Sequence, residues 1–439
     1  MKKRFITHAS ILLSAFAMLA VTNSAYAETV PEIPTDNDTL YVPERAIVLT
    51  GEKSNADRDV MAVFYSREDL APNDPDAPRF LLLDKQGKIA FGVGGQLYAT
   101  ASYDFHGAVD DNGFATYDIA VPDNPALRSR LGADLSHSSL FVKLVGKTSK
   151  FGMFQVYMQA NFTGNSGGYG FKLKQAYVTL GHFTMGLANS TFVDASTQAP
   201  TVDSEGPSGQ IGGKNILFRY TTPVRKGFSA ALSVEFPQTT YTLSEQTSAL
   251  SARVPDIPAY VQYAWGPGQH LRISGLFRDM AYRDLKTGKN ILQPGYGVKI
   301  STITNVDVYG IVQLFGHIAY GRGIGKYIND LGGNGFDLVY AKQAGKMEAP
   351  EMMGWTAGVL VNPSRKIQFT AAFSRAQVFG LDHLGDDTYH YGQYLDINGF
   401  YNFDSNFKIG AEYLRGWRQD YSGVVGTANR FDVLLQYSF

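Results

Sequence analysis

The sequence predicts an all-β protein, a 16-stranded antiparallel transmembrane β-barrel. Sixteen segments alternate between apolar and polar residues, and short and long connections alternate between them. A transmembrane barrel combines these two features with an even strand number. The composition of the 439 residues agrees, with 46 glycines, 13% aromatic residues and only 18% charged residues. After the N-terminus no apolar run approaches the roughly 20 residues of a membrane-spanning helix.

The N-terminus has the three parts of a secretory signal peptide. Basic residues at positions 2–4 precede an apolar run from Ile11 to Val21, and the small-residue pattern Ala25-Tyr26-Ala27 follows. The apolar run is too short to anchor the chain in a bilayer. We therefore expect residues 1–27 to be a signal peptide that is cleaved after Ala27 on export.

Residues 28–87 differ in composition from the rest of the chain. Six prolines fall in this stretch, and residues 57–70 (DRDVMAVFYSREDL) match one short helix. The segment has too few apolar residues for a core of its own, as is typical of a linker. We expect an N-terminal periplasmic extension over 28–87 and the transmembrane β-barrel over 88–439.

The alternation is clearest in the last strand. Phe431, Val433, Leu435, Tyr437 and Phe439 form one apolar face, and the residues between them are mostly polar. This period of two is that of a strand with one face in an apolar medium. Fifteen other segments share it: 89–105, 139–148, 154–162, 171–180, 183–191, 215–222, 228–236, 257–265, 270–278, 296–304, 306–320, 352–361, 367–379, 390–403 and 407–417.

The connections follow the pattern of an outer-membrane barrel, which has short periplasmic turns and longer outer loops. Short links such as Gly181–His182 and Thr304–Asn305 are interleaved with longer ones over 192–214, 237–256 and 321–350. The apolar face is too continuous for a soluble barrel of this size, although a soluble sandwich or two small β domains is the alternative. Sixteen strands leave a lumen too wide for side chains to fill, which indicates a water channel.

The polar alternates, assigned to the inner face, are more often basic than acidic. The basic candidates for the pore constriction and its selectivity are Lys172, Lys174, Arg219, Arg272 and Arg278. Rings of basic side chains favour anions in a pore, because fixed charge and donors replace the hydration that the anion loses. The alternative is an ordinary polar interior with cross-strand ion pairs.

The third long loop carries the acidic candidates for the constriction. Asp194, Asp203 and Glu205 lie between prolines and glycines in residues 192–214. If this loop folds inward, its carboxylates face a basic wall and set up a transverse field that orients a passing solute. The alternative is a solvated surface loop.

No pattern of residues indicates an enzyme. The chain has no cysteine, and it contains no zinc-protease, nucleophile-elbow or phosphate-loop motif. Gly92 to Gly95 lie within an alternating strand, where glycine relieves crowding or bends a barrel. His137 has serines on both sides, but neighbouring strand residues point to opposite faces. We therefore expect no catalytic residue, no metal site and no cofactor.

Three stretches resemble the DcaP-like trimeric porins of Gram-negative outer membranes. Phe80–Phe105 is similar to the start of the family's first strand, and Ile216–Pro223 resembles a later strand with its Arg-Tyr pair. Lys172–Pro207 resembles a strand, turn and strand followed by the inward loop, with Ser190-Thr191-Phe192 and Asp194 at the family's S-T-F-x-D position.

This resemblance implies a homotrimer in the outer membrane of a Gram-negative bacterium. It also implies a third loop folded into the lumen and passive uptake of small negatively charged solutes. The chain departs from the family pattern in two places. Residues 28–79 have no heptads for a coiled coil, and Lys174-Gln175 and Asn189 stand where the family has an Arg-His pair and a tryptophan.

We therefore expect an outer-membrane porin for passive diffusion of small, anionic, hydrophilic solutes. Its partners are then membrane lipid, other copies of the chain and those solutes. Nucleic acid is not expected, because the formal net charge is −1. The alternatives are a general, weakly selective porin and an outer-membrane adhesin or receptor barrel that binds through its long loops, such as 237–256 and 321–350.

Overall fold

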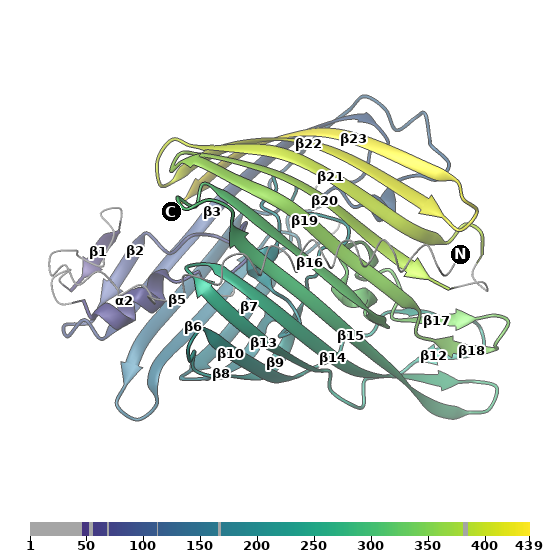
Figure 1. The fold of residues 1–439 in the computed structure, drawn as a ribbon, viewed down its shortest axis with the longest axis horizontal. Helices are drawn as coiled ribbons and strands as arrows, with labels where there is room; N and C mark the ends of the chain where they lie inside the picture. Colours follow the sequence, from purple (N-terminus) through teal and green to yellow (C-terminus); the bar gives the residue numbers. More distant parts are fainter. Residues whose placement is uncertain (1–45, 52–55, 68–69, 112, 166–167, 381–384) are drawn as a thin grey trace.

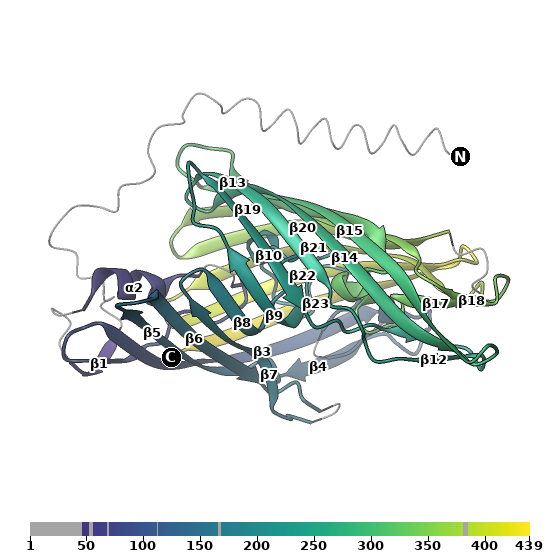
Figure 2. The ribbon, with the colours of Figure 1, turned by 90° about the horizontal axis from the view of Figure 1, so that it is seen from below.

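The computed structural model describes residues 46–51, 56–67, 70–111, 113–165, 168–380 and 385–439. These residues form a β-barrel whose strands run obliquely along its length (Figures 1 and 2). The predicted signal peptide and its cleavage position lie outside the described residues. Among the described residues no helix is long and apolar enough to cross a membrane.

Sixteen antiparallel strands form the wall, which confirms the predicted fold class. Neighbours in the chain pair with one another, and the ring closes where β23 (Val425–Ser438) pairs with β3 (Ile89–His106). The strands between them are β5 (Ser139–Thr148), β6 (Gly152–Asn161), β7 (Lys172–Leu180), β8 (Phe183–Asn189), β9 (Lys214–Thr221), β10 (Phe228–Glu235), β13 (Ile257–Gly266), β14 (Gln269–Asp284), β15 (Lys289–Asn305), β16 (Val312–Arg322), β19 (Glu351–Ser364), β20 (Ile367–Phe379), β21 (Tyr389–Asn402) and β22 (Phe407–Asp420).

Shorter elements lie in the long loops. β4 (Arg130–Asp134) extends the pairing of β3, and β12 (Thr247–Ala249) extends that of β14. A separate small sheet joins the fourth long loop, residues 236–256 between β10 and β13, to the sixth, residues 323–350 between β16 and β19. Its strands are β11 (Tyr241–Thr242), β17 (Leu338–Ala341) and β18 (Lys346–Glu348). The 3-10 helices are η2 (Thr116–Asp118), η3 (Ala195–Thr197), η4 (Gly325–Tyr327) and η5 (Asn329–Leu331).

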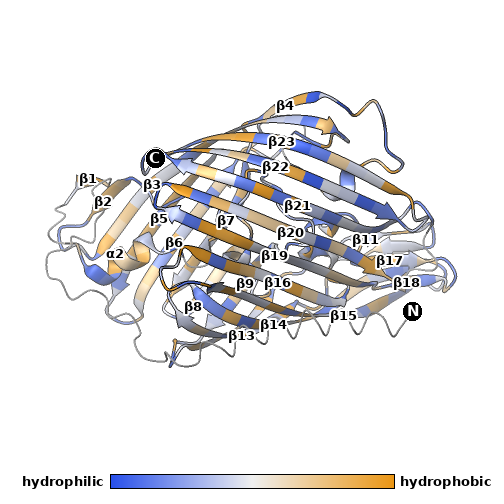
Figure 3. Cartoon of the chain, turned by 45° about the horizontal axis from the view of Figure 1, so that its top comes forward, coloured by the Kyte–Doolittle hydropathy of each residue, from blue (hydrophilic) through white to orange (hydrophobic). Residues whose placement is uncertain are grey.

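The two faces of the wall differ as the alternation predicts. Val261, Ile273, Ile300 and Ile318 are paired in a row across four neighbouring strands, and each is at least 37% exposed. The residues beside Ile273 in the chain, Arg272 and Ser274, point inward and are buried. In Figure 3, hydrophobic positions, coloured orange, recur along the strands of the wall. An apolar outer surface of this kind matches the hydrocarbon of a bilayer.

The predicted start of one strand and the predicted position of the turn before it are wrong. Residues 306–320 were expected to form a strand after a link at Thr304–Asn305, but β15 continues to Asn305 and β16 begins at Val312. The Asp307 carboxylate accepts backbone N–H groups of Tyr309, Ile311 and Val312 at 2.8, 3.1 and 2.6 Å. Such local side-chain bonds favour a turn over the strand ladder.

The segment before the barrel packs against the inside of its short-turn end. β1 (Ile47–Thr50) lies parallel to β2 (Phe80–Leu83), and β2 pairs with β3. Figures 1 and 2 place these strands and helix α2 (Arg58–Tyr65) at the end where the C-terminus lies. The Asp57 side chain caps α2, as the predicted short helix requires.

Helix α2 gains its core from the barrel wall. Phe64 is fully buried against the inner face of β3, where a Cβ at Gly92 would lie 2.6 Å from the Phe64 ring. Val60, Met61 and Val145 share this cluster. The segment can therefore form a buried apolar core with few apolar residues of its own, because the barrel wall supplies the remaining ones.

Replacing Ile273 with lysine tests the orientation of the wall. A lysine facing the bilayer midplane destabilises an outer-membrane barrel by about 2–4 kcal/mol. We expect this loss in the free energy of unfolding, measured by denaturant titration in lipid vesicles. The control is Leu285→Lys, because Leu285 is exposed in the turn between β14 and β15. Equal stability of the two variants would contradict the assignment.

Candidate functional site

The third long loop, residues 190–213, runs through the interior of the barrel. It leaves the wall between β8 and β9 and contacts residues of β14, β20 and β22. Only Ser196 and Glu205 of its side chains are exposed. We call residues 190–213 the inward loop.

A basic cluster on the wall holds the start of the inward loop. One oxygen of Asp194 contacts His270 Nε2 at 2.9 Å and accepts a hydrogen bond from Ser301 Oγ at 2.6 Å. Arg272 lies 3.7 Å from the other oxygen and donates to the Val193 carbonyl at 3.2 Å. Burial alone would raise the pKa of Asp194, but Arg272 and His270 outweigh it and hold the pKa well below its usual range.

An acidic cluster on the opposite part of the wall holds the middle of the loop. The Glu412 carboxylate accepts the backbone N–H groups of Val202 and Asp203 at 2.9 and 2.6 Å. Tyr394 donates to the Asp203 carboxylate at 3.0 Å, and burial raises the pKa of Asp203. Because backbone donors satisfy Glu412, the loop docks on acidic residues through its amides rather than through basic side chains.

Gly209 permits the closest approach of the loop to the wall. Its N–H donates to Ser374 Oγ at 2.8 Å, and an added Cβ would lie 2.1 Å from the Arg375 carbonyl oxygen. Any side chain here would therefore push the loop away from β20.

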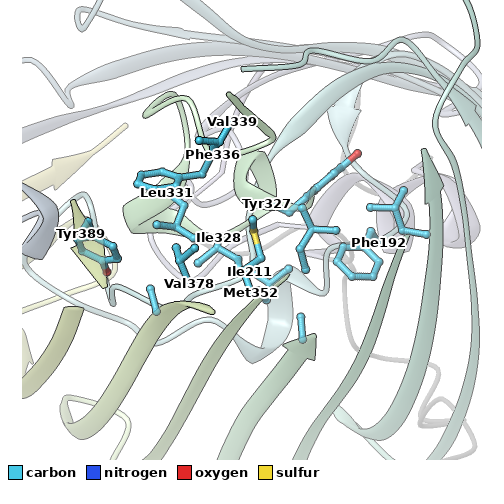
Figure 4. Close-up of a cluster of buried hydrophobic side chains, with 14 residues drawn as sticks. Phe192, Ile211, Tyr327, Ile328, Leu331, Phe336, Val339, Met352, Val378 and Tyr389 are labelled. Carbon is cyan, nitrogen blue, oxygen red and sulfur yellow. The ribbon is translucent and has the colours of Figure 1, made fainter. Parts of the chain in front are cut away.

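The sixth long loop also packs inside the barrel. Tyr327, Ile328 and Leu331 form a buried cluster with Phe192 and Ile211 of the inward loop, and Figure 4 shows this cluster within the ring of strands. Backbone bonds join the two loops, including Gly212 N to the Tyr327 carbonyl at 3.0 Å. Part of the 321–350 loop therefore belongs to the interior, which argues against its use as an external binding surface.

Glu205 of the inward loop interacts electrostatically with Lys174 of the wall. Lys174 also interacts with Lys172, Lys214 and the carboxylate of Asp74. Partial desolvation within the barrel, together with the carboxylates of Asp203 and Asp330, raises the pKa of Glu205 to about 7. The structure thus brings together Lys172, Lys174 and Glu205 from the predicted constriction set.

The other predicted residues have different surroundings. Arg219 lies on the inner face of β9 and is 8% exposed. Asp194 and Arg272 belong to the loop anchor, and Asp203 lies beside Glu412 and Tyr394 and interacts electrostatically with Arg430.

Arg278 also departs from its predicted role. It is fully buried, 3.1 Å from Asp256 and 2.8 Å from Asp337. Since it bonds to residues of the fourth and sixth loops, it holds loops and does not line the open lumen.

Several residues of this site were not predicted. His317 accepts the Ile211 N–H at 3.0 Å, and Ser374 accepts that of Gly209. Inward alternation identifies such residues as lumen-facing, but their partners depend on the loop path. In the described part of the chain, no group of three or more histidine, aspartate or glutamate residues could hold a metal ion.

Comparison with known proteins agrees with this geometry. The family model of the DcaP outer membrane protein matches residues 72–236. The solved outer membrane channel DcaP of Acinetobacter baumannii has 19% identity and a TM-score of 0.70, over 81% of this chain and 98% of that one. Residues 72–236 thus resemble the DcaP family, and the barrel has the fold of the DcaP channel. The resemblance found in the sequence is thereby confirmed.

Other solved porins share the fold of this DcaP-like barrel. The anion-selective porin from Comamonas acidovorans has 13% identity and a TM-score of 0.52, covering 80% of this chain and all of that one. OmpF of Salmonella typhi has 12% identity and a TM-score of 0.50, covering 80% and 98%. No match was found among curated proteins. The chain thus has the architecture of porin-like outer-membrane channels.

Replacing Asp194 with alanine tests the loop anchor. The change leaves Arg272 and His270 buried without their carboxylate, and breaking such a pair destabilises by about 3–5 kcal/mol. We expect the inward loop to detach intermittently and to increase current noise in single-channel recordings. Asp110→Ala, at an exposed carboxylate in the first long loop, is the control. Noise equal to that of the unmodified protein would refute the anchoring role.

Proposed function

We propose that the protein is an outer-membrane porin through which small anionic, hydrophilic solutes diffuse passively. The observation that supports this most directly is the group of lysines opposite Glu205. Lys172 and Lys174 come from β7 and Lys214 from the start of β9, so three positive charges gather where Lys174 meets two carboxylates, Asp74 and Glu205. Fixed positive charges in a narrow passage attract anions and replace part of their hydration.

The position of the inward loop supports this proposal. The loop docks through its backbone on Glu412 of β22 and Asn398 of β21, and its buried Asp203 faces the same side. We infer that the open passage lies on the other side, along the wall that carries Lys172, Lys174 and Arg219. A solute there meets more basic than acidic side chains.

The wider proposal follows the resemblance to DcaP-like porins. We propose a homotrimer in the Gram-negative outer membrane, with residues 1–27 removed as a signal peptide, 28–87 as the periplasmic extension and 88–439 as the barrel. The exposed apolar outer face suits contact with lipid and with neighbouring protomers. The proposed activity is passive, and it requires no cofactor or catalytic residue.

Reversing two lysine charges tests the selectivity. Lys172→Glu together with Lys174→Glu replaces two positive charges with two negative ones, which disfavours anions at short range. We expect the chloride-to-potassium permeability ratio to fall about tenfold. The ratio is calculated from the reversal potential measured across a planar bilayer in a KCl gradient.

The control for this variant is Lys150→Glu, in the exposed turn between β5 and β6. It should leave the ratio nearly unchanged. If the double variant has the ratio of the control, the lysines do not set selectivity. A cation-selective unmodified channel would refute the anion proposal itself.

Glu205 should make the selectivity depend on pH. Its pKa is about 7, so the carboxyl is mostly neutral below that pH and charged above it. The added negative charge opposes the lysines, so anion preference should fall about twofold from about pH 6 to about pH 7.5. Glu205→Gln should remove most of this change. An identical pH dependence in the variant would exclude Glu205 as its source.

A further inference from the structure

The segment before the barrel reaches deep into its short-turn mouth. We call residues 56–67 and 70–79 the mouth segment. Its Ser66 carbonyl accepts a hydrogen bond from Lys143 Nζ at 3.2 Å, and Asp59 pairs with Lys147 at 2.8 Å. Together with the burial of Phe64 on β3, these contacts hold α2 against the inner face of β3 and β5.

The second half of the mouth segment contacts the inward loop. Asn73 Nδ2 donates to the Thr201 carbonyl at 3.1 Å, and the Asn73 carbonyl accepts from Gln96 Nε2 at 3.4 Å. Gln175 Nε2 of β7 donates to Asp74 at 3.5 Å. The segment therefore joins the wall at the mouth to the loop that crosses the lumen.

Arg67 gives this part of the segment a fixed shape. It pairs with Asp76 at 2.6 Å and donates to the carbonyls of Ala71 and Asp74, both at 3.1 Å. The Ala71 N–H donates in turn to the Asp74 carboxylate at 2.9 Å. Two carboxylates are thus held in place at the mouth.

Both carboxylates border an open space. A cavity of about 640 Å³ lies between the mouth segment, the inward loop and the wall, and Asp74, Asp76, Gln198 and Lys408 line it. Asp74 interacts electrostatically with Lys174, and Asp76 does so with Lys408, on which the positive charge of Arg67 also acts. A solute that moves through this cavity from the lysines and Glu205 therefore passes the carboxylates of Asp74 and Asp76.

We propose that the mouth segment is a second selectivity element of the channel. Asp74 and Asp76 offset the positive potential of Lys174 and Lys408, so they lower the anion preference that the wall alone would produce. The segment also narrows the mouth and lowers conductance. The proposal rests on the proposed channel function, and it assigns residues before the barrel to the pore.

Neutralising the two carboxylates tests the electrostatic part. Asp74→Asn with Asp76→Asn keeps side-chain acceptors but removes two negative charges. We expect the chloride-to-potassium permeability ratio of the full-length channel to rise about twofold in planar bilayers. The matched control is Asp386→Asn with Asp387→Asn, an exposed pair in the seventh long loop at the other rim. An unchanged ratio in the first variant would overturn the selectivity role.

Displacing the segment without altering charge tests the steric part. A side chain at Gly92 collides with Phe64 and Pro78, whereas Gly275 on β14 has open space around it. Gly92→Leu should raise single-channel conductance about 1.5-fold, and Gly275→Leu should not. If the mouth segment has moved in Gly92→Leu but the single-channel conductance has not risen, the steric part of the proposal is overturned.

Thiol labelling reports that movement, because the chain has no native cysteine. Val60 is fully buried, so Val60→Cys should resist a membrane-impermeant maleimide and should react once Gly92→Leu is added. Rapid labelling of Val60→Cys alone would show that the segment does not dock, which refutes the proposal. If Lys172→Glu with Lys174→Glu changes the permeability ratio and Asp74→Asn with Asp76→Asn does not, only the mouth-segment proposal fails. If the unmodified chain does not conduct, the channel function fails.

Discussion

The closure of β3 on β23 is the constraint on which the other features depend. In lipid no water satisfies an open strand edge, so every backbone group of the wall must pair within the ring. A ring of sixteen strands leaves a wide lumen, and the protein fills much of it with its own loops. The buried apolar clusters accordingly lie inside the barrel, between loops and wall, while the largest apolar surface faces outward.

The inward loop divides this lumen by charge. Its start is held by a carboxylate, Asp194, on basic residues, and its middle is held by backbone amides on the carboxylate of Glu412. In the second contact, neutral amides satisfy the Glu412 carboxylate as hydrogen-bond donors, so the loop docks there without a basic side chain. Lys174 of β7 is left to interact with Glu205 of the loop and with Asp74.

The sequence was sufficient for the wall, since period-two alternation reports directly which face meets lipid. It failed at 306–311, where the side chain of Asp307 organises a turn at the start of the predicted strand. It placed Arg278 and Arg272 correctly on the inner face, but alternation carries no information about which loop covers an inner residue. The contacts of Asp203 and of α2 could not be predicted from the sequence either, because both join segments that are distant in the chain.

The central claim is that the passage beside the inward loop favours anions. The most direct test is the reversal potential of the unmodified full-length channel in a KCl gradient across a planar bilayer at neutral pH. A reversal potential toward that of chloride is expected, because Lys172, Lys174 and Lys214 gather where the carboxylates that act on Lys174 are Asp74 and a partly protonated Glu205. A reversal potential toward that of potassium would contradict the claim.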